Sequence, residues 1–106
     1  MKDIVSPDHY EQRARVMKAM AHASRLKMVD ELARGERCVC ELRDLVGHDM
    51  STVSKHLALL KQAGIVTDEK RGKQVYYSLK VPCVLGFFTC LDSVLDQNQE
   101  LQKESP

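Results

Sequence analysis

The sequence predicts a mainly α-helical fold that carries one small β-hairpin. Val53, Leu57 and Leu60 recur at four- and three-residue steps, which is the spacing of one apolar face of a helix. After Gly64 the pattern changes to short runs of β-branched and aromatic residues, which are typical of strands. Helical spacing returns in an apolar stretch after Pro82. Together with the two helical patterns expected near the N-terminus and one before the central helix, these observations predict five helices and a two-stranded hairpin.

The size and charge of the chain indicate one globular domain, residues 1–106. A length of 106 residues matches the usual size of a single domain. A charged content of 29% beside 43% hydrophobic residues is typical of a folded protein rather than a disordered one. Because the net charge is only +1, any contact with nucleic acid must come from local clusters of basic side chains.

We expect neither an export signal nor a membrane span. Residues 1–10 contain charges and a proline but no apolar run. The longest apolar stretch, residues 81–91, is interrupted by Pro82 and Gly86 and is shorter than the about 20 residues that a membrane-spanning helix needs. The protein is therefore expected to be soluble and cytoplasmic. In that compartment the four cysteines suit metal or redox chemistry better than a disulfide framework.

Two helices are expected before residue 36. The first covers about residues 8–20, because Ser6 and Pro7 are a capping residue and an early proline. The second covers residues 22–32, where apolar residues again recur at three- and four-residue steps before Gly35. We expect packing or a dimer contact for the first helix.

The next two helices predict a helix-turn-helix. The first of them covers residues 38–47 and ends with Gly47 as its cap. A tight turn at residues 48–50 follows, Ser51 is expected to cap the next helix, and Gly64 closes it. A helix, a short turn, a second helix and then a hairpin is the order of a winged helix-turn-helix, whose second helix enters the DNA major groove.

The hairpin and the last helix complete the chain. Strands are expected at residues 65–67 and 75–79, joined by a polar tip with Gly72 at its turn. The last helix covers about residues 82–97, and a polar, frayed tail follows. Because this helix is apolar over more than one face, we expect it to pack against a second copy of the chain.

Two polar surfaces are candidates for DNA contact. The helix after the turn begins with small hydroxyl side chains and a lysine, which can donate to phosphates or base edges or remain a solvated face. The histidine that follows them is either a packing or capping residue or a phosphate contact. Basic residues around Gly72 suit a wing that lies over the DNA backbone, or they keep the hairpin tip soluble. The predicted DNA-binding residues are Ser51, Thr52, Ser54, Lys55, His56, Lys70, Arg71, Lys73 and Gln74.

Five short segments occur in a familiar order and spacing. They are residues 20–26 (MAHASRL), 38–42 (CVCEL), 51–60 (STVSKHLALL), 63–66 (AGIV) and 71–77 (RGKQVYY). In these segments, and over nearly its whole length, the chain resembles the ArsR/SmtB family of winged helix-turn-helix repressors. The resemblance implies a homodimer that binds operator DNA without a cofactor and is released by an inducer. It does not identify the inducer, because the family uses several unrelated sensing sites.

Cys38 and Cys40 form a Cys-Val-Cys sequence at the start of the third helix. Two thiolates at this spacing can chelate one soft metal or metalloid ion. Side chains at i and i+2 of a regular helix point to nearly opposite sides, so both sulfurs reach one ion only if the first turn is unwound or begins later. The alternative is that both cysteines serve as small apolar core residues.

The family resemblance favours the metal site. Arsenical and cadmium/lead sensors of the ArsR/SmtB family carry the same Cys-Val-Cys, which implies As(III) or Sb(III) as inducer, with cadmium or lead as an alternative. The match is incomplete, because the third cysteine of the arsenical sensors corresponds to Arg43 here. The N-terminal cysteines of the cadmium/lead sensors are also missing, and only His9 lies in that arm. The family's zinc pattern on the last helix is absent as well, which disfavours zinc or cobalt there.

Cys83 and Cys90 are candidates for an additional or alternative thiol site. They lie seven residues apart on the expected last helix, a rise of about 10 Å. One regular helix cannot bring both to one ion, because each sulfur must lie about 2.3 Å from it. Two copies of the helix, paired antiparallel, can bring Cys83 of one chain near Cys90 of the other for a shared ion or a disulfide. The alternative is apolar packing at a dimer contact.

The sequence therefore predicts a dimeric DNA-binding repressor that a thiophilic inducer, As(III) or Sb(III) first, releases from its operator. One alternative is a repressor that senses thiol oxidation or persulfides. Another is an interaction module that kept the winged helix without binding DNA. We expect no enzyme, because the histidines are scattered and no catalytic constellation is visible.

Overall fold

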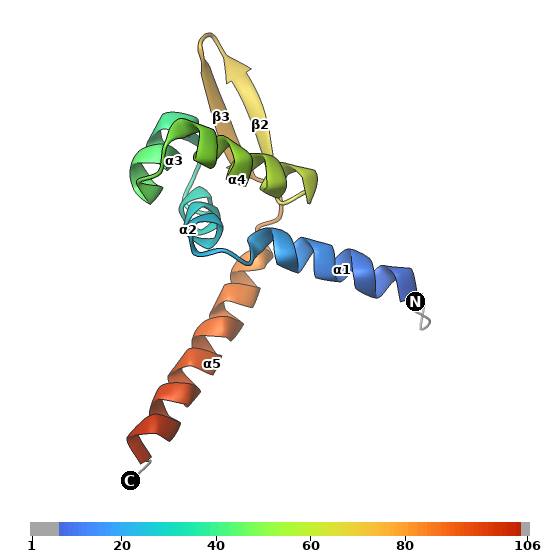
Figure 1. Ribbon diagram of the computed structural model, residues 1–106, viewed down its shortest axis with the longest axis vertical. Coiled ribbons are helices and arrows are strands. Elements are labelled where there is room, and N and C mark those ends of the chain that lie inside the picture. Colours follow the sequence, from blue (N-terminus) through green and yellow to red (C-terminus); the bar gives the residue numbers. More distant parts are fainter. Residues whose placement is uncertain (1–6, 105–106) are drawn as a thin grey trace.

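The computed structural model describes residues 7–104, so the capping role expected for Ser6 lies outside the described residues. The elements, in chain order, are α1 (Pro7–Met20), α2 (Ala23–Leu32), β1 (Arg37–Cys38), α3 (Val39–Val46), α4 (Met50–Gln62), β2 (Val66–Arg71), β3 (Gln74–Leu79) and α5 (Val84–Glu104) (Figure 1). The predicted fold class is confirmed, with helices, a helix-turn-helix at α3 and α4, and a wing formed by β2 and β3.

The sheet differs from the prediction in having three strands, in the antiparallel order β1-β3-β2. The added strand, β1, contributes only Arg37 and Cys38, which pair with Tyr77 and Tyr76 of β3. Two residues are too few to show an alternating pattern, which explains why the sequence did not reveal this strand.

The wing strands run further toward the tip than expected. They pair as far as Arg71 and Gln74, which leaves only Gly72 and Lys73 for the turn. Gly72 has a φ of 61°, in the left-handed region that favours glycine, and this allows the tight connection. The polar residues placed in a loose tip are therefore strand residues with fixed directions.

Three helix boundaries also differ from the prediction. α3 begins at Val39, because Cys38 has an extended backbone and acts as the N-cap. α4 is capped by Asp49, so the prediction for Ser51 was wrong; the carboxylate accepts a hydrogen bond from the backbone N–H of Thr52 at 2.8 Å. α5 continues to Glu104, since the Gln, Glu and Lys residues of the expected tail are good helix formers.

The hydrophobic core lies between α2, α3, α4 and the base of the wing. Its fully buried side chains are Met28, Val29, Leu42, Val53, Leu57, Leu60, Ile65 and Val66. The inward face predicted for α4 is confirmed. Residues buried this completely remove most of the apolar surface of a small domain from water, which is the main stabilising contribution to folding.

Two helices extend away from this core. In Figure 1 α1 and α5 point away from the wing and from each other. They carry most of the exposed large apolar side chains, which include Val16, Met17, Leu85, Phe87, Leu91, Val94 and Leu95. Within residues 7–104, no helix combines the length and the hydrophobicity that a membrane crossing requires.

Candidate DNA interface and thiol site

The N-terminal half of α4 places its polar side chains at the surface. Val53, Leu57 and Leu60 are 0% exposed, so the opposite side of the helix faces outward. Ser51, Ser54 and Lys55 are exposed there, and Thr52 is half-buried. Hydrogen bonds from Thr52 fix the first turn and hold the pKa of the Asp49 carboxyl below its usual range. Short hydroxyls and one lysine on a capped, regular helix can donate to phosphates and base edges.

His56 lies on the same helix but faces inward, with 8% of its surface exposed. Its Nδ1 lies 2.9 Å from Nη1 of Arg25, and its ring centroid lies 4.5 Å from that of His22. A guanidinium can only donate, so Nδ1 is the acceptor and the ring is neutral. Burial lowers the pKa of His56, and the charges of His22 and Arg25 lower it further. Of the two expected roles, these surroundings support packing, and we leave His56 out of the proposed DNA contacts.

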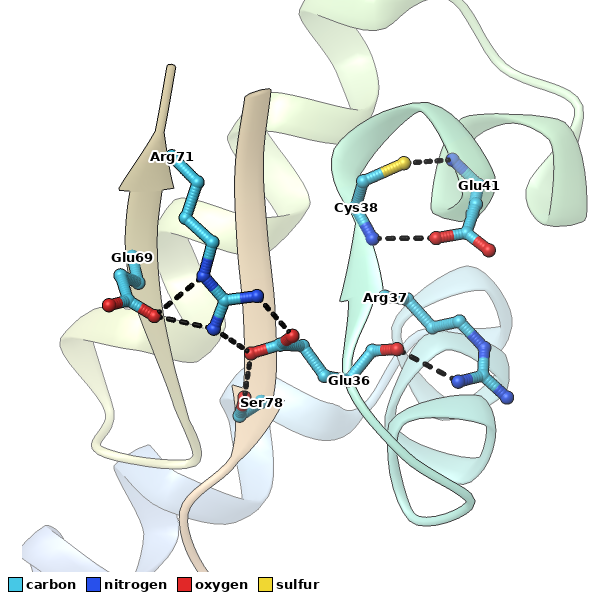
Figure 2. A network of polar contacts seen from close by, with 7 residues as sticks. All are labelled: Glu36, Arg37, Cys38, Glu41, Glu69, Arg71 and Ser78. Atoms are coloured by element: carbon cyan, nitrogen blue, oxygen red, sulfur yellow. Dashed lines mark hydrogen bonds and ion pairs between the residues drawn. The ribbon is translucent and has the colours of Figure 1, made fainter. Parts of the chain in front are cut away.

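The basic residues of the wing fall into two groups. Lys70, Lys73 and Gln74 are exposed, and within residues 7–104 neither lysine forms an ion pair. Arg71 is different, because its guanidinium binds the carboxylates of Glu36 and Glu69 (Figure 2). Both carboxylates raise the pKa of Arg71, mainly through their hydrogen bonds. The sequence analysis missed this pairing, since no local pattern connects Arg71 with a glutamate 35 residues earlier.

Cys38 is the N-cap of α3. Its Sγ accepts a hydrogen bond from the backbone N–H of Glu41 at 3.4 Å, and its own N–H donates to Glu41 Oε1 at 2.9 Å (Figure 2). These reciprocal bonds form a capping box in which sulfur takes the place of the usual hydroxyl oxygen. Because the helix begins only at Val39, Cys38 and Cys40 are not two residues of a regular helix. This is the later helix start that the two sulfurs require in order to meet.

Cys38 and Cys40 are joined in a disulfide, with their Cα atoms 5.4 Å apart. The expectation of four thiols is therefore wrong for this pair, which forms one local bridge rather than a framework. Cys38 is buried and Cys40 is half-buried. The Sγ of Cys40 also lies 3.8 Å from Oε1 of Gln74 in the wing, a contact in which the reduced thiol can donate. Two sulfurs held this close can serve either as a dithiol for one soft ion or as a dithiol–disulfide couple.

A third ligand does not lie beside this pair within the described part of the chain. Among residues 7–104, no group of three or more His, Cys, Asp or Glu side chains is placed to hold a metal ion. Arg43, at the position of the third cysteine in arsenical sensors, is exposed and lies 3.5 Å from Asp44. The chain alone therefore offers two sulfurs to an ion at this place.

Cys83 and Cys90 lie apart from the first thiol pair and both are exposed. Cys83 is in the turn before α5 rather than on the helix, so the expected spacing of two regular turns between the thiols was wrong. It lines an open apolar hollow with Met17 of α1 and Phe87 of α5. A pairing between two chains, as expected for these thiols, stays a prediction.

Comparison with known proteins agrees with this geometry. Residues 22–68, which include α2, the helix-turn-helix and the start of the wing, match the family model described as bacterial regulatory protein, arsR family. The chain is 37% identical over 101 residues to the arsenic resistance transcriptional regulator ArsR1 of Pseudomonas putida, which covers 94% of this chain and 74% of that protein. It is 43% identical over 67 residues to a cadmium resistance regulatory protein, a CadC homolog of Staphylococcus aureus, which covers 62% of this chain and 55% of that protein.

A solved structure supports the same conclusion. The homodimeric winged helix-turn-helix DNA-binding domain of Mb0332 from Mycobacterium bovis, described as a possible ArsR-family regulator, has a TM-score of 0.75 to this chain. The two are 32% identical, and the match covers 94% of each chain. The sequence relatives and the arrangement of α3, α4 and the wing thus agree, and the chain belongs to the ArsR/SmtB family of winged helix-turn-helix transcriptional regulators.

Proposed function

We propose that this protein is a homodimeric transcriptional repressor that binds operator DNA and leaves it when a thiophilic inducer binds Cys38 and Cys40. The observation that carries the proposal is the position of Cys38. It caps α3, the first helix of the helix-turn-helix, and its sulfur lies next to that of Cys40. Chemistry at the thiols therefore acts on the helix that packs against the DNA-reading helix.

DNA contact is assigned to α4 and to the lysines of the wing. The exposed Ser51, Ser54 and Lys55, with the half-buried Thr52, form the face that enters a major groove. Lys70 and Lys73 supply charge to the DNA backbone from the wing. A homodimer doubles these contacts, which compensates for the small net charge of the chain.

The cap suggests how an inducer acts. In the reduced protein the sulfur of Cys38 is the acceptor for the backbone N–H of Glu41. A soft ion bound by both sulfurs competes for the electron pairs on Cys38 and weakens this cap, whose loss is worth about 0.5–2 kcal/mol. A tenfold loss of DNA affinity needs a bias of only about 1.4 kcal/mol between the two shapes of the protein. Weakening the cap is therefore large enough to release DNA.

We place As(III) and Sb(III) first among inducers. Trivalent arsenic and antimony prefer sulfur ligands, and two bonds to this pair leave the third for water, a small thiol or a more distant cysteine. The ArsR1 relative is named for arsenic resistance, while the CadC homolog is named for cadmium resistance. Cadmium or lead is therefore the alternative ion.

A second candidate function, thiol redox sensing, is favoured by the disulfide between Cys38 and Cys40. A peroxide would oxidise the two thiols by two electrons, form the S–S bond and be reduced to water, with the thiol protons leaving in that water. The same cap would then be altered by the bridge instead of by an ion. Persulfides would oxidise the same pair.

One experiment separates these functions. Operator sequences are enriched from random DNA with the reduced protein, and DNA affinity is then measured by anisotropy with arsenite, Cd²⁺ or hydrogen peroxide, with intact mass recorded for each sample. The proposal expects arsenite to release DNA from the wild type and from a Cys83→Ser/Cys90→Ser variant, but not from Cys38→Ser or Cys40→Ser. Release by peroxide alone would favour the redox sensor. Failure to enrich any DNA would favour an interaction module, and release that depends only on Cys83 and Cys90 would move the sensor to α5.

A further inference from the structure

The wing arginine reaches across the sheet to the segment that carries the thiols. Nη1 and Nη2 of Arg71 donate to Oε1 and Oε2 of Glu36 at 2.6 and 2.7 Å, in bidentate geometry (Figure 2). Arg71 ends β2 at one edge of the sheet, and Glu36 immediately precedes β1 at the other edge. The ion pair therefore passes over the central strand β3 and connects the wing tip to a residue two positions before Cys38.

The central strand supports the same connection. The guanidinium of Arg71 lies 4.8 Å from the ring centroid of Tyr76, and Tyr76 is the β3 residue that pairs with Cys38 of β1. Ser78 of β3 also donates to Glu36 Oε2 at 3.5 Å. Arg71 is thus in contact with the cross-strand neighbour of Cys38 as well as with Glu36.

The segment that holds Glu36 is anchored to the helices. Nη1 of Arg37 donates to the carbonyl oxygen of Glu36 at 2.8 Å, and its Nε donates to Glu31 of α2 at 2.9 Å. On the other side of this segment, Cys38 is held by the capping box with Glu41. A change in the backbone at Cys38 is therefore transmitted to Glu36 rather than absorbed by a loose loop.

We propose that the Glu36–Arg71 ion pair is the link through which the chemical state of Cys38 and Cys40 reaches the wing. In this role Arg71 is a positioning residue, which sets the wing relative to the helix-turn-helix, and not a phosphate contact. Both partners are partly exposed, with side chains 36% and 47% accessible, so the pair contributes little to overall stability. Its effect is on the position of the wing, and the consequence for DNA rests on the function proposed above.

Glu69 provides a matched control within the same cluster. It accepts from Arg71 at 2.6 Å, but it lies on β2 together with Arg71. Its removal takes away one carboxylate from the guanidinium without separating the wing from Glu36. Glu36→Gln and Glu69→Gln therefore make the same chemical change on one arginine and differ only in whether the bridge across the sheet is weakened.

The link is tested by hydrogen–deuterium exchange on the full chain. Wild type, Glu36→Gln and Glu69→Gln are compared in oxidised, reduced and phenylarsine oxide-treated form, with the state of the thiols verified by intact mass. We expect exchange in the wing, residues 66–79, to differ between thiol states in the wild type and in Glu69→Gln. In Glu36→Gln this difference should be largely lost. A Glu36→Arg/Arg71→Glu double variant should recover part of it, because the charges are exchanged.

Two outcomes would overturn the link: identical wing exchange in every verified thiol state of the wild type, or a difference that survives unchanged in Glu36→Gln. Circular dichroism and the thermal midpoint of each variant show whether the fold is intact. DNA affinity is a separate measurement. If the wild type shows the exchange difference but no thiol reagent releases DNA, the proposed function fails and the link stands. If arsenite releases DNA equally from the wild type and Glu36→Gln, the proposed function stands and release does not use the link.

Discussion

The guanidinium of Arg25 connects two helices by donating to His56 Nδ1 at 2.9 Å and, through Nε, to the carbonyl oxygen of Ala19 at 2.7 Å. Arg25 belongs to α2, His56 to the DNA-reading helix α4, and Ala19 to the end of α1. This one side chain therefore fixes the reading helix relative to a helix of the expected dimer contact. Its dependence on a neutral histidine makes the arrangement sensitive to pH.

Stability should fall in mild acid because of His56. Burial and nearby cationic groups hold its folded pKa below the ordinary 6.5, so the unfolded chain binds the proton more readily. Stability is fully present above the unfolded pKa and is lost as pH falls through 6.5 toward the lower folded value. Urea unfolding in neutral and mildly acidic buffer should show a smaller loss in His56→Gln, which still accepts from Arg25, than in wild type. His9→Gln on α1 is the control, and an equal loss in all three proteins would refute the assignment.

The sulfur cap of α3 should have a measurable effect on stability. In reducing buffer, Cys38→Ala should lower the free energy of unfolding by about 0.5–2 kcal/mol, because the N–H of Glu41 loses its acceptor. Cys38→Ser keeps an acceptor and should be less destabilised. Urea denaturation of the three reduced proteins checks this expectation. Equal losses for alanine and serine would indicate that packing of the buried sulfur, and not the cap, is what matters.

DNA reading by α4 is tested at its exposed start. Lys55→Ala should weaken operator binding, and Thr52→Ala should change the preference at one base position by about 1–3 kcal/mol if Thr52 contacts that base. Lys61 is the control on the same helix, because it pairs with Asp68 at 2.9 Å near the far end. Anisotropy titrations should show Lys61→Ala close to wild type. If Lys55→Ala and Thr52→Ala also bind like wild type, another element reads the DNA.

The wing lysines and Arg71 should behave differently. Lys70→Gln or Lys73→Gln should lower affinity for all sequences and flatten the dependence on salt by about one unit for each DNA phosphate that a wing no longer neutralises. Arg71→Gln should leave the salt slope almost unchanged, because two carboxylates already neutralise that guanidinium. This differs from the expectation drawn from the sequence, in which all three charges act on DNA. A salt slope that falls equally for Arg71→Gln would restore that expectation.

The dimer should depend on the exposed apolar residues of α1 and α5. Phe88 packs against the core, so its substitution would also disturb the single chain. Leu91 is 37% exposed and is the cleaner probe. Sedimentation at micromolar concentration should show a dimer for the wild type and monomers for Leu91→Glu, with unchanged helix content. A monomeric wild type would exclude the dimer and, with it, an intersubunit role for Cys83 and Cys90.

Local sequence patterns determined the elements that depend on periodicity and backbone conformation. Val53, Leu57 and Leu60 are buried as their spacing predicts, because a helix places such residues on one face. Gly47 and Gly72 have positive φ values at the end of α3 and in the wing turn, where glycine relieves a steric conflict of neighbouring atoms. The Cys-Val-Cys sequence was also recognisable as the candidate thiol site.

Tertiary structure alone decided which polar and sulfur groups meet. β1 exists because Arg37 and Cys38 find Tyr77 and Tyr76, and this pairing delays the start of α3 so that Cys38 becomes a cap beside Cys40. Arg71 is neutralised by Glu36 only because the sheet brings together residues 35 positions apart. The inward position of His56 likewise depends on Arg25 of another helix. Periodicity reports which face of an element is buried, whereas the partners of a side chain are fixed only when distant segments pack.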